Sequence, residues 1–191
     1  MRIAISSGHN ANTGAQAHDG TDEWTHNEVL RKLLVTELER RGHTVKSLLR
    51  DRKAGYSWGM KKLGAEMKAF RADACLELHF NSAGPTAHGF EMLHYKGSRW
   101  GETLASCLAT SFGEIFSGQI RARHGTGMLA RTRYNRGSAY LRYTPCPAVI
   151  YEPGFASNPN EWALLKESLH AQAIALADGF DDFSKEMKNV R

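Results

Sequence analysis

The chain has 191 residues, of which 41% are hydrophobic, and a formal net charge of +5 at pH 7. Its length fits one domain that buries most of the surface of the unfolded chain. No apolar run is long enough to span a bilayer, and no linker, low-complexity segment or repeat divides the chain. These features exclude stable membrane insertion and predict a single domain over residues 1–191, without a separate binding module.

The first apolar run, Arg2–Ile5, stops at the small residues Ser6–Gly8. This pattern predicts a first strand, with His9 in the loop that follows it. The run is too short for the hydrophobic region of a signal peptide, so we expect synthesis in the cytoplasm without one. Three cysteines without a Cys-x-x-Cys pair agree with that reducing compartment.

A helical pattern runs from Glu28 to Arg41, where apolar residues recur near helical spacing before the stop signal Gly42. Glu28 would then lie in the first turn of the helix. An acidic residue there is favoured by the helix dipole, which is the simpler explanation for it. The same position also lets the carboxylate face a crevice at the end of a neighbouring strand.

Two later apolar runs end in polar side chains. The run over residues 75–80 contains His79, and the run over residues 148–151 is followed by Glu152. Together with the histidine after the first strand, these residues would close three strands, and ligands bind beyond the carboxyl ends of strands in an open α/β sheet. A carboxylate is costly to bury without a partner, so Glu152 indicates a metal or a polar network.

Two histidines, a carboxylate and a further glutamate match a hydrolytic zinc site that keeps one coordination position open for water. Such a site lowers the pKa of the water to ~7, so no covalent nucleophile is needed. A single histidine in this pattern is more often a hydrogen-bonded strand-end residue than a ligand, so the hypothesis depends on the combination. The residues by themselves predict zinc-assisted amide hydrolysis.

The remaining patterns are those of a scaffold. Further strands are expected over residues 44–48 and 89–93, further helices over residues 58–70, 100–116 and 169–183, and a helix start at Asn158-Pro159. Strands that alternate with helices predict an α/β fold, a single-domain sandwich with a mixed, largely parallel sheet flanked by helices.

Four motifs occur in a familiar order. They are Gly8-His9, Asn27-Glu28, His79-x-Asn81, and the run Glu-x-Gly-Phe-x-Ser-Asn-Pro that begins at Glu152. In this order they resemble the zinc-dependent N-acetylmuramoyl-L-alanine amidases, from Ile3 to about Leu165. The most specific part of the resemblance is Pro147–Pro159.

The resemblance implies a function and a set of roles. His9, Glu28 and His79 would bind Zn²⁺, and Glu152 would be the catalytic carboxylate. The enzyme would cleave the amide between N-acetylmuramic acid and L-alanine, with peptidoglycan as its partner. Because no signal peptide is evident, we expect a phage or prophage endolysin, a monomer that reaches the cell wall after release from the cytoplasm; a secreted amidase in its mature form, with the leader removed, is the alternative.

Some positions depart from the family pattern. Serine often lies two residues before the middle histidine in the family, but Glu77 lies there in this chain. Glu77 and His79 share a face of the strand by alternation, so Glu77 either orients a ligand, competes as a ligand, or anchors a basic group. Asn81 is a candidate for orienting a ligand or contacting the substrate.

A basic segment precedes the last strand. Its arginines are Arg121, Arg123, Arg131, Arg133, Arg136 and Arg142. Peptidoglycan stems carry carboxylates that arginine binds with two hydrogen bonds, which makes Arg131 and Arg142 candidate substrate contacts. Basic patches also occur in nucleic-acid-binding proteins, but the chain has no recognised nucleic-acid motif, and we expect no nucleic-acid partner.

Two alternatives stay open at this level. A zinc exopeptidase or stem-peptide peptidase would keep the metal site and change the substrate. A non-catalytic wall-binding module would carry a degenerate site, which the presence of Glu152 argues against.

Overall fold

The computed structural model describes residues 1–10, 13–50, 55–135 and 137–189. Within these ranges one six-stranded sheet has the order β2-β1-β3-β6-β4-β5. The strands are β1 (Arg2–Ser7), β2 (Thr44–Leu48), β3 (Ala74–Leu78), β4 (Glu91–Tyr95), β5 (Met128–Arg131) and β6 (Ala148–Glu152). Only the pairing of β4 with β6 is antiparallel among these strands. The predicted α/β fold with a mixed, largely parallel sheet is confirmed.

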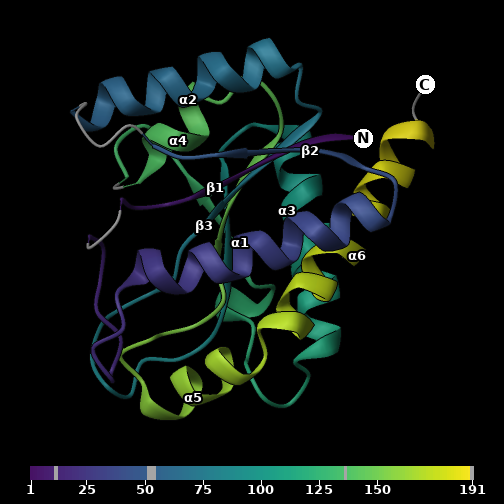
Figure 1. The fold of residues 1–191 in the computed structure, drawn as a ribbon. Helices are drawn as coiled ribbons and strands as arrows, with labels where there is room; N and C mark the ends of the chain where they lie inside the picture. Colours follow the sequence, from purple (N-terminus) through teal and green to yellow (C-terminus); the bar gives the residue numbers. More distant parts are fainter. Residues whose placement is uncertain (11–12, 51–54, 136, 190–191) are drawn as a thin grey trace.

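Helices cover both faces of the sheet (Figure 1). They are α1 (Glu23–Arg40), α2 (Tyr56–Phe70), α3 (Arg99–Ile115), α4 (Ser138–Tyr143), α5 (Pro159–Glu167) and α6 (Leu169–Asn189), with a 3₁₀ turn at Arg123–Gly125. Helices α1, α3 and α6 pack together on one face, and α2 packs with α4 on the other. Among the described helices none has the length and hydropathy needed to cross a membrane.

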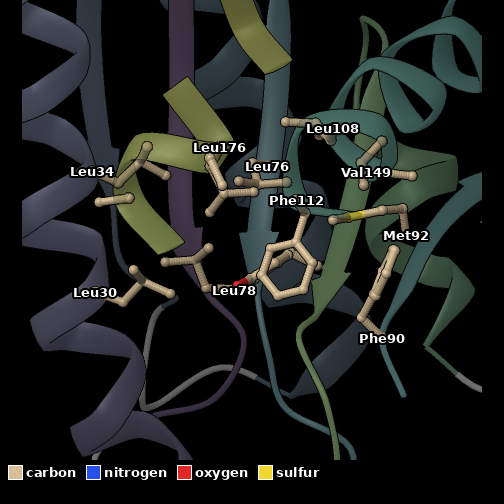
Figure 2. Packing of buried hydrophobic residues seen from close by; sticks show 14 of the residues in the cluster. Leu30, Leu34, Leu76, Leu78, Phe90, Met92, Leu108, Phe112, Val149 and Leu176 are labelled. Carbon is tan, nitrogen blue, oxygen red and sulfur yellow. The ribbon is translucent and has the colours of Figure 1, made fainter. Parts of the chain in front are cut away.

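Strand alternation divides the core into two layers. Leu76, Val149 and Met92 point toward the layer with α1, α3 and α6, where they meet Leu34, Leu108, Phe112 and Leu176 (Figure 2). Cys75 and Ile150 point the other way, toward α2 and α4. Each fully buried leucine or valine contributes roughly 1.5–3 kcal/mol, so both layers fix the register of the central strands. Every second residue beyond them keeps this orientation at the carboxyl edge of the sheet.

The first helix begins earlier than the sequence pattern predicts. It starts at Glu23, not at Glu28, because Asp22 is its N-cap and accepts a hydrogen bond from the backbone N–H of Thr25 at 3.0 Å. Glu28 therefore lies in the second turn. This shift of the helix start changes which glutamate faces the carboxyl edge of the sheet.

Two short elements were not predicted, the strand β5 and the helix α4. Both lie in the basic segment before β6, where β5 has only four residues and α4 six. Arg136 of this segment lies outside the described residues. The expected strands and helices elsewhere in the chain are present, with ends that differ by a few residues.

Candidate active site

The candidate residues gather at the carboxyl ends of three adjacent parallel strands. His9 follows β1, His79 follows β3, and Glu152 is the last residue of β6. Backbone hydrogen bonds extend the sheet past the strand ends, from Gly8 N–H to the Leu78 carbonyl at 2.8 Å and from His79 N–H to the Tyr151 carbonyl at 2.9 Å. The sheet therefore fixes the two histidines at one edge, as the sequence predicted.

Glu23 joins the two histidines. Its carboxylate lies 3.2 Å from Nε2 of His9 and 2.9 Å from Nδ1 of His79. The imidazole rings are nearly perpendicular, with centroids 5.1 Å apart. One ligand atom from each of the three side chains lies within 4.8 Å of the others. Two imidazoles and a carboxylate at this spacing form a donor set suited to zinc.

Several groups hold the Glu23 carboxylate in place. Backbone N–H groups of Ala15 and Phe80 donate to it at 2.9 and 3.1 Å. Burial alone would raise the pKa of Glu23, but the hydrogen bond from His79 and the charges of His79 and His9 outweigh it and lower the pKa. The first turn of a helix also favours a negative charge. Glu23 is therefore an ionised, preorganised carboxylate.

Two glycines make room for this cluster. A Cβ on Gly8 would lie 2.0 Å from Nε2 of His79, and one on Gly14 would lie 2.8 Å from the Glu23 side chain. Gly14 also has a φ of +104°, which L-residues with side chains rarely adopt. The backbone thus approaches the side chains as closely as glycine permits.

Glu28 does not reach the histidines. Its carboxylate accepts a 2.5 Å hydrogen bond from the Ser7 hydroxyl and forms an ion pair with Arg31. Burial would raise the pKa of Glu28, but the bonds from Arg31 and Ser7 lower it. The geometry corrects the sequence interpretation: Glu23, not Glu28, lies with His9 and His79. The signal missed in the sequence was Asp22 as the cap of a helix whose first residue is Glu23.

The pKa of Glu152 is shifted in the opposite direction from that of Glu23. Burial raises its pKa to about 8, the charge of His79 opposes this, and the charges of Glu23 and Glu91 add to it. Its Oε2 atom is buried and has no hydrogen-bond partner within the described residues. Glu152 therefore combines an open oxygen with a pKa near neutrality, which suits proton transfer.

Glu77 lies behind His79. Its Oε2 atom is 3.3 Å from Nε2 of His79, on the nitrogen that does not face Glu23. The side chain is 4% exposed. The structure thus brings Glu77 to the histidine, as strand alternation predicted, but it does not bring it into the three-residue cluster.

Asn81 links the loops on either side of the site. Its side-chain amide donates to Glu91 at 2.9 Å, and its backbone bonds with Gly154 and Ala156 in the loop after β6. Glu91 faces Glu152 across the antiparallel pair and contacts Arg123 and His124. Asn81 thus supports the strand ends that carry the site, and Glu91 is a nearby acid that the sequence pattern did not single out.

Glu161 fastens the same loop from α5. Its buried carboxylate accepts hydrogen bonds from the backbone N–H groups of Gly89 at 2.6 Å and Phe155 at 2.8 Å. Asn158 caps the helix by accepting from the backbone N–H of Asn160. The backbone that follows Glu152 is therefore tied to the backbone that precedes β4.

A cleft of about 790 Å³ opens over these residues. Its lining includes His9, Glu23, Glu77, His79, Asn81, Arg131 and Glu152. Arg131 adds a cationic group, and its charge opposes the rise in the pKa of Glu152. Arg142 does not line the cleft, because its guanidinium is exposed, donates to the Tyr143 hydroxyl and lies over that ring. The prediction that Arg142 contacts the substrate is therefore not supported by its position.

Comparison with known proteins agrees with this geometry. The sequence profile described as N-acetylmuramoyl-L-alanine amidase matches residues 3–179. The chain belongs to the N-acetylmuramoyl-L-alanine amidase family. It is accordingly an amidase that hydrolyses the amide bond between N-acetylmuramic acid and L-alanine in peptidoglycan. No curated protein matches this chain at a significant level.

Solved structures share the amidase fold. The amidase Ami1 from Mycobacterium smegmatis is 21% identical, with a TM-score of 0.81 over 96% of each chain. The amidase AmiC2 of Nostoc punctiforme is 22% identical, with a TM-score of 0.78 over 97% of each chain. The catalytic domain of the CD27L endolysin is 21% identical, with a TM-score of 0.78 over 94% of this chain and 96% of that domain. Because amidases and an endolysin share the fold, the endolysin assignment stays a prediction.

Proposed function

We propose that this amidase is zinc-dependent, with His9, Glu23 and His79 as the metal ligands and Glu152 as the proton-transfer group. The observation that carries the proposal is the pairing of two different carboxylates at one sheet edge. Glu23 is ionised and fixed between two imidazoles, whereas Glu152 has an unpaired oxygen and a pKa raised to about 8. Zinc at the three-residue cluster would supply a Lewis acid and a water acidified to ~7.

Glu152 performs the proton transfers in this mechanism. Its Oε2 atom accepts the proton that the attacking water gives up, and the resulting carboxylic acid donates it to the departing amide nitrogen. The raised pKa favours the second step, because a carboxylic acid that keeps its proton near neutral pH can donate it to the leaving nitrogen. No side-chain nucleophile takes part, which agrees with the burial of Ser6, Ser7 and Cys75.

Arg131 provides a substrate contact on the Glu152 side of the cleft. Its Nε atom is buried without a hydrogen-bond partner in the described part of the chain. A guanidinium in that condition is stabilised by a carboxylate, and the stem peptide of peptidoglycan carries several. We therefore assign to Arg131 the orientation of the stem beyond the scissile amide, a role that Arg142 is too far out to share.

Two measurements on the same protein test the proposal. Elemental analysis of protein purified without chelator should give about one zinc per chain, with loss of zinc in His9→Ala and His79→Ala. Mass spectrometry of digested peptidoglycan should show intact stem peptides with an L-alanine amino terminus. Cleavage inside the stem would identify a peptidase, and full zinc occupancy in either histidine variant would remove that residue from the site.

A further inference from the structure

His79 has a carboxylate at each ring nitrogen. Nδ1 lies 2.9 Å from Oε1 of Glu23, and Nε2 lies 3.3 Å from Oε2 of Glu77. Glu23 belongs to the proposed metal cluster, whereas Glu77 lies outside it. The two ring nitrogens therefore have different partners: Nδ1 faces the cluster, and Nε2 faces Glu77, which also lines the cleft.

The neighbouring strands fix the position of Glu77. It lies in β3, in register with Ser6 of β1 and Ile150 of β6, so both neighbouring strands flank it. Its side chain is buried and points toward the α2 and α4 face, like Cys75 two residues earlier. A carboxylate held there is costly unless it accepts hydrogen bonds, and the His79 ring provides one donor.

A neutral imidazole can bind a metal only through the nitrogen that carries no proton, and the hydrogen bond at the other nitrogen decides which one that is. We propose that Glu77 is a positioning residue whose carboxylate accepts a hydrogen bond from Nε2–H of His79 and thereby directs the Nδ1 lone pair toward Glu23 and His9. This inference rests on the proposed zinc site and adds a residue that tunes it.

The surroundings fix the ring and supply the second oxygen of Glu77 with donors. The backbone of Gly8 passes so close that a Cβ there would overlap the His79 ring, which restricts the ring to one position. Within the described part of the chain, Oε1 of Glu77 is buried and accepts no hydrogen bond, and the buried hydroxyls of Ser6 and Tyr140 lie close to each other. Burial raises the pKa of Tyr140, and the charges of Cys75 and Glu77 raise it further, which places Glu77 near this hydroxyl. Both hydroxyls can rotate to donate.

Zinc affinity is the first readout. Competition with a chromophoric chelator should show a zinc Kd that is about 10–100-fold weaker in Glu77→Leu, the range for loss of an outer partner of a ligand. Glu77→Gln keeps an acceptor oxygen without the charge, so its loss should be smaller. Glu28→Gln is the matched control, a buried glutamate whose partners Ser7 and Arg31 are not ligands, and it should bind zinc like the wild type.

The tautomer of His79 is a readout that a purely structural role would not move. Imidazole ¹⁵N NMR of the zinc-loaded wild type should show a proton on Nε2 and none on Nδ1. That Nε2 signal should shift or exchange faster in Glu77→Gln. If Glu77→Leu does not fold, judged by the thermal melt of chelated protein, Glu77→Gln alone carries the test.

Two results would overturn the inference and leave the proposed function standing. Wild-type zinc affinity in both Glu77 variants would show that the carboxylate does not position His79. Zinc loss as complete as in His79→Ala would show that Glu77 is itself a ligand. By contrast, a wild-type protein that binds no zinc would contradict the proposed function. The zinc content of the wild type is measured before any Glu77 variant, so the two failures can be told apart.

Discussion

Two carboxylates in one cleft, Glu23 and Glu152, are pushed in opposite directions by their surroundings. Both are shielded from solvent, and burial raises the pKa of each. At Glu23 two imidazoles and two backbone N–H groups reverse that effect and lower the pKa. At Glu152 one oxygen has no hydrogen-bond partner in the part of the chain that the structure describes, two other carboxylates add their repulsion, and the pKa rises to about 8.

This contrast assigns the chemistry. Groups whose environments push their pKa values apart take different roles, one as a fixed charge and the other as a proton carrier. Glu23 is suited to bind a cation because it stays ionised, and Glu152 is suited to move a proton because it titrates near neutrality. Residue type alone does not separate these roles. The number of donors around each carboxylate does.

The largest effect is expected at Glu152. Glu152→Gln keeps the size and polarity of the side chain but cannot accept a proton, so peptidoglycan hydrolysis should fall by about 10²–10⁴-fold. Zinc content should stay at the wild-type level, because the side chain is outside the ligand cluster. Turnover and elemental analysis are measured on one preparation. Activity within a few-fold of wild type would contradict the proton-transfer role, and zinc loss would make Glu152 a ligand.

A substitution of Glu23 should reduce zinc content first and activity as a consequence, the reverse of Glu152→Gln. Glu23→Gln should weaken zinc binding by more than the ~10–100-fold that follows loss of an outer partner, because it removes a proposed ligand itself. Activity should fall in proportion to the zinc lost. Glu28→Gln is the control on the same helix, and chelator competition should find its zinc affinity unchanged. Weaker zinc binding in Glu28→Gln together with wild-type affinity in Glu23→Gln would contradict the assignment of Glu23.

A smaller effect is expected from the glycine beneath His79. Gly8→Ala places a methyl group where the His79 ring lies, so the ring must shift. A displacement of about 1 Å can cost roughly 10²-fold in rate. Gly84→Ala is the control, since an added Cβ there meets nothing within 4 Å. Equal activity in the two variants would show that the ring has more room than the structure indicates.

The smallest effect concerns stability against pH in chelated protein. The folded state holds a proton on Glu152 up to about pH 8, whereas the ordinary pKa of a glutamate is 4.5. This contribution to the free energy of unfolding is full below pH 4.5 and is lost as the pH rises toward 8. Between pH 5 and 8 the melting temperature of wild type should therefore fall by a few degrees more than that of Glu152→Gln. Parallel curves would contradict the raised pKa.

The sequence was a good guide wherever apolar runs alternate with helical patterns. The apolar runs that end near His79 and Glu152 are long enough to be recognised as strands. The parallel pairing of these strands then brings their carboxyl ends together. Glu77 was placed on the His79 face by alternation alone, and the structure agrees. Local periodicity is sufficient in these cases because each position depends on its own strand.

Two positions differ from the sequence interpretation for another reason. Glu28 was preferred to Glu23 because the apolar period becomes visible only after the first turn, while the start of the helix is fixed by a single side chain, Asp22. Arg142 was treated like Arg131 because both lie in one basic segment. Their difference comes from β5 and α4, whose few residues carry no period, so that one arginine lines the cleft and the other faces solvent.

The anchor at Glu161 changes how the most recognisable stretch of this sequence is understood. Most residues after Glu152 do no chemistry: Gly154 leaves space beside the Glu161 carboxylate, Phe155 donates its N–H to it, and Asn158 starts the helix that carries it. The stretch therefore encodes a shape. A related chain that lost the glutamate at position 152 but kept this run would still fold the same loop, and a motif search would retrieve it. An inactive relative of this kind would differ from an active one at position 152 alone, whereas Glu161 belongs to the part of the pattern that specifies the loop.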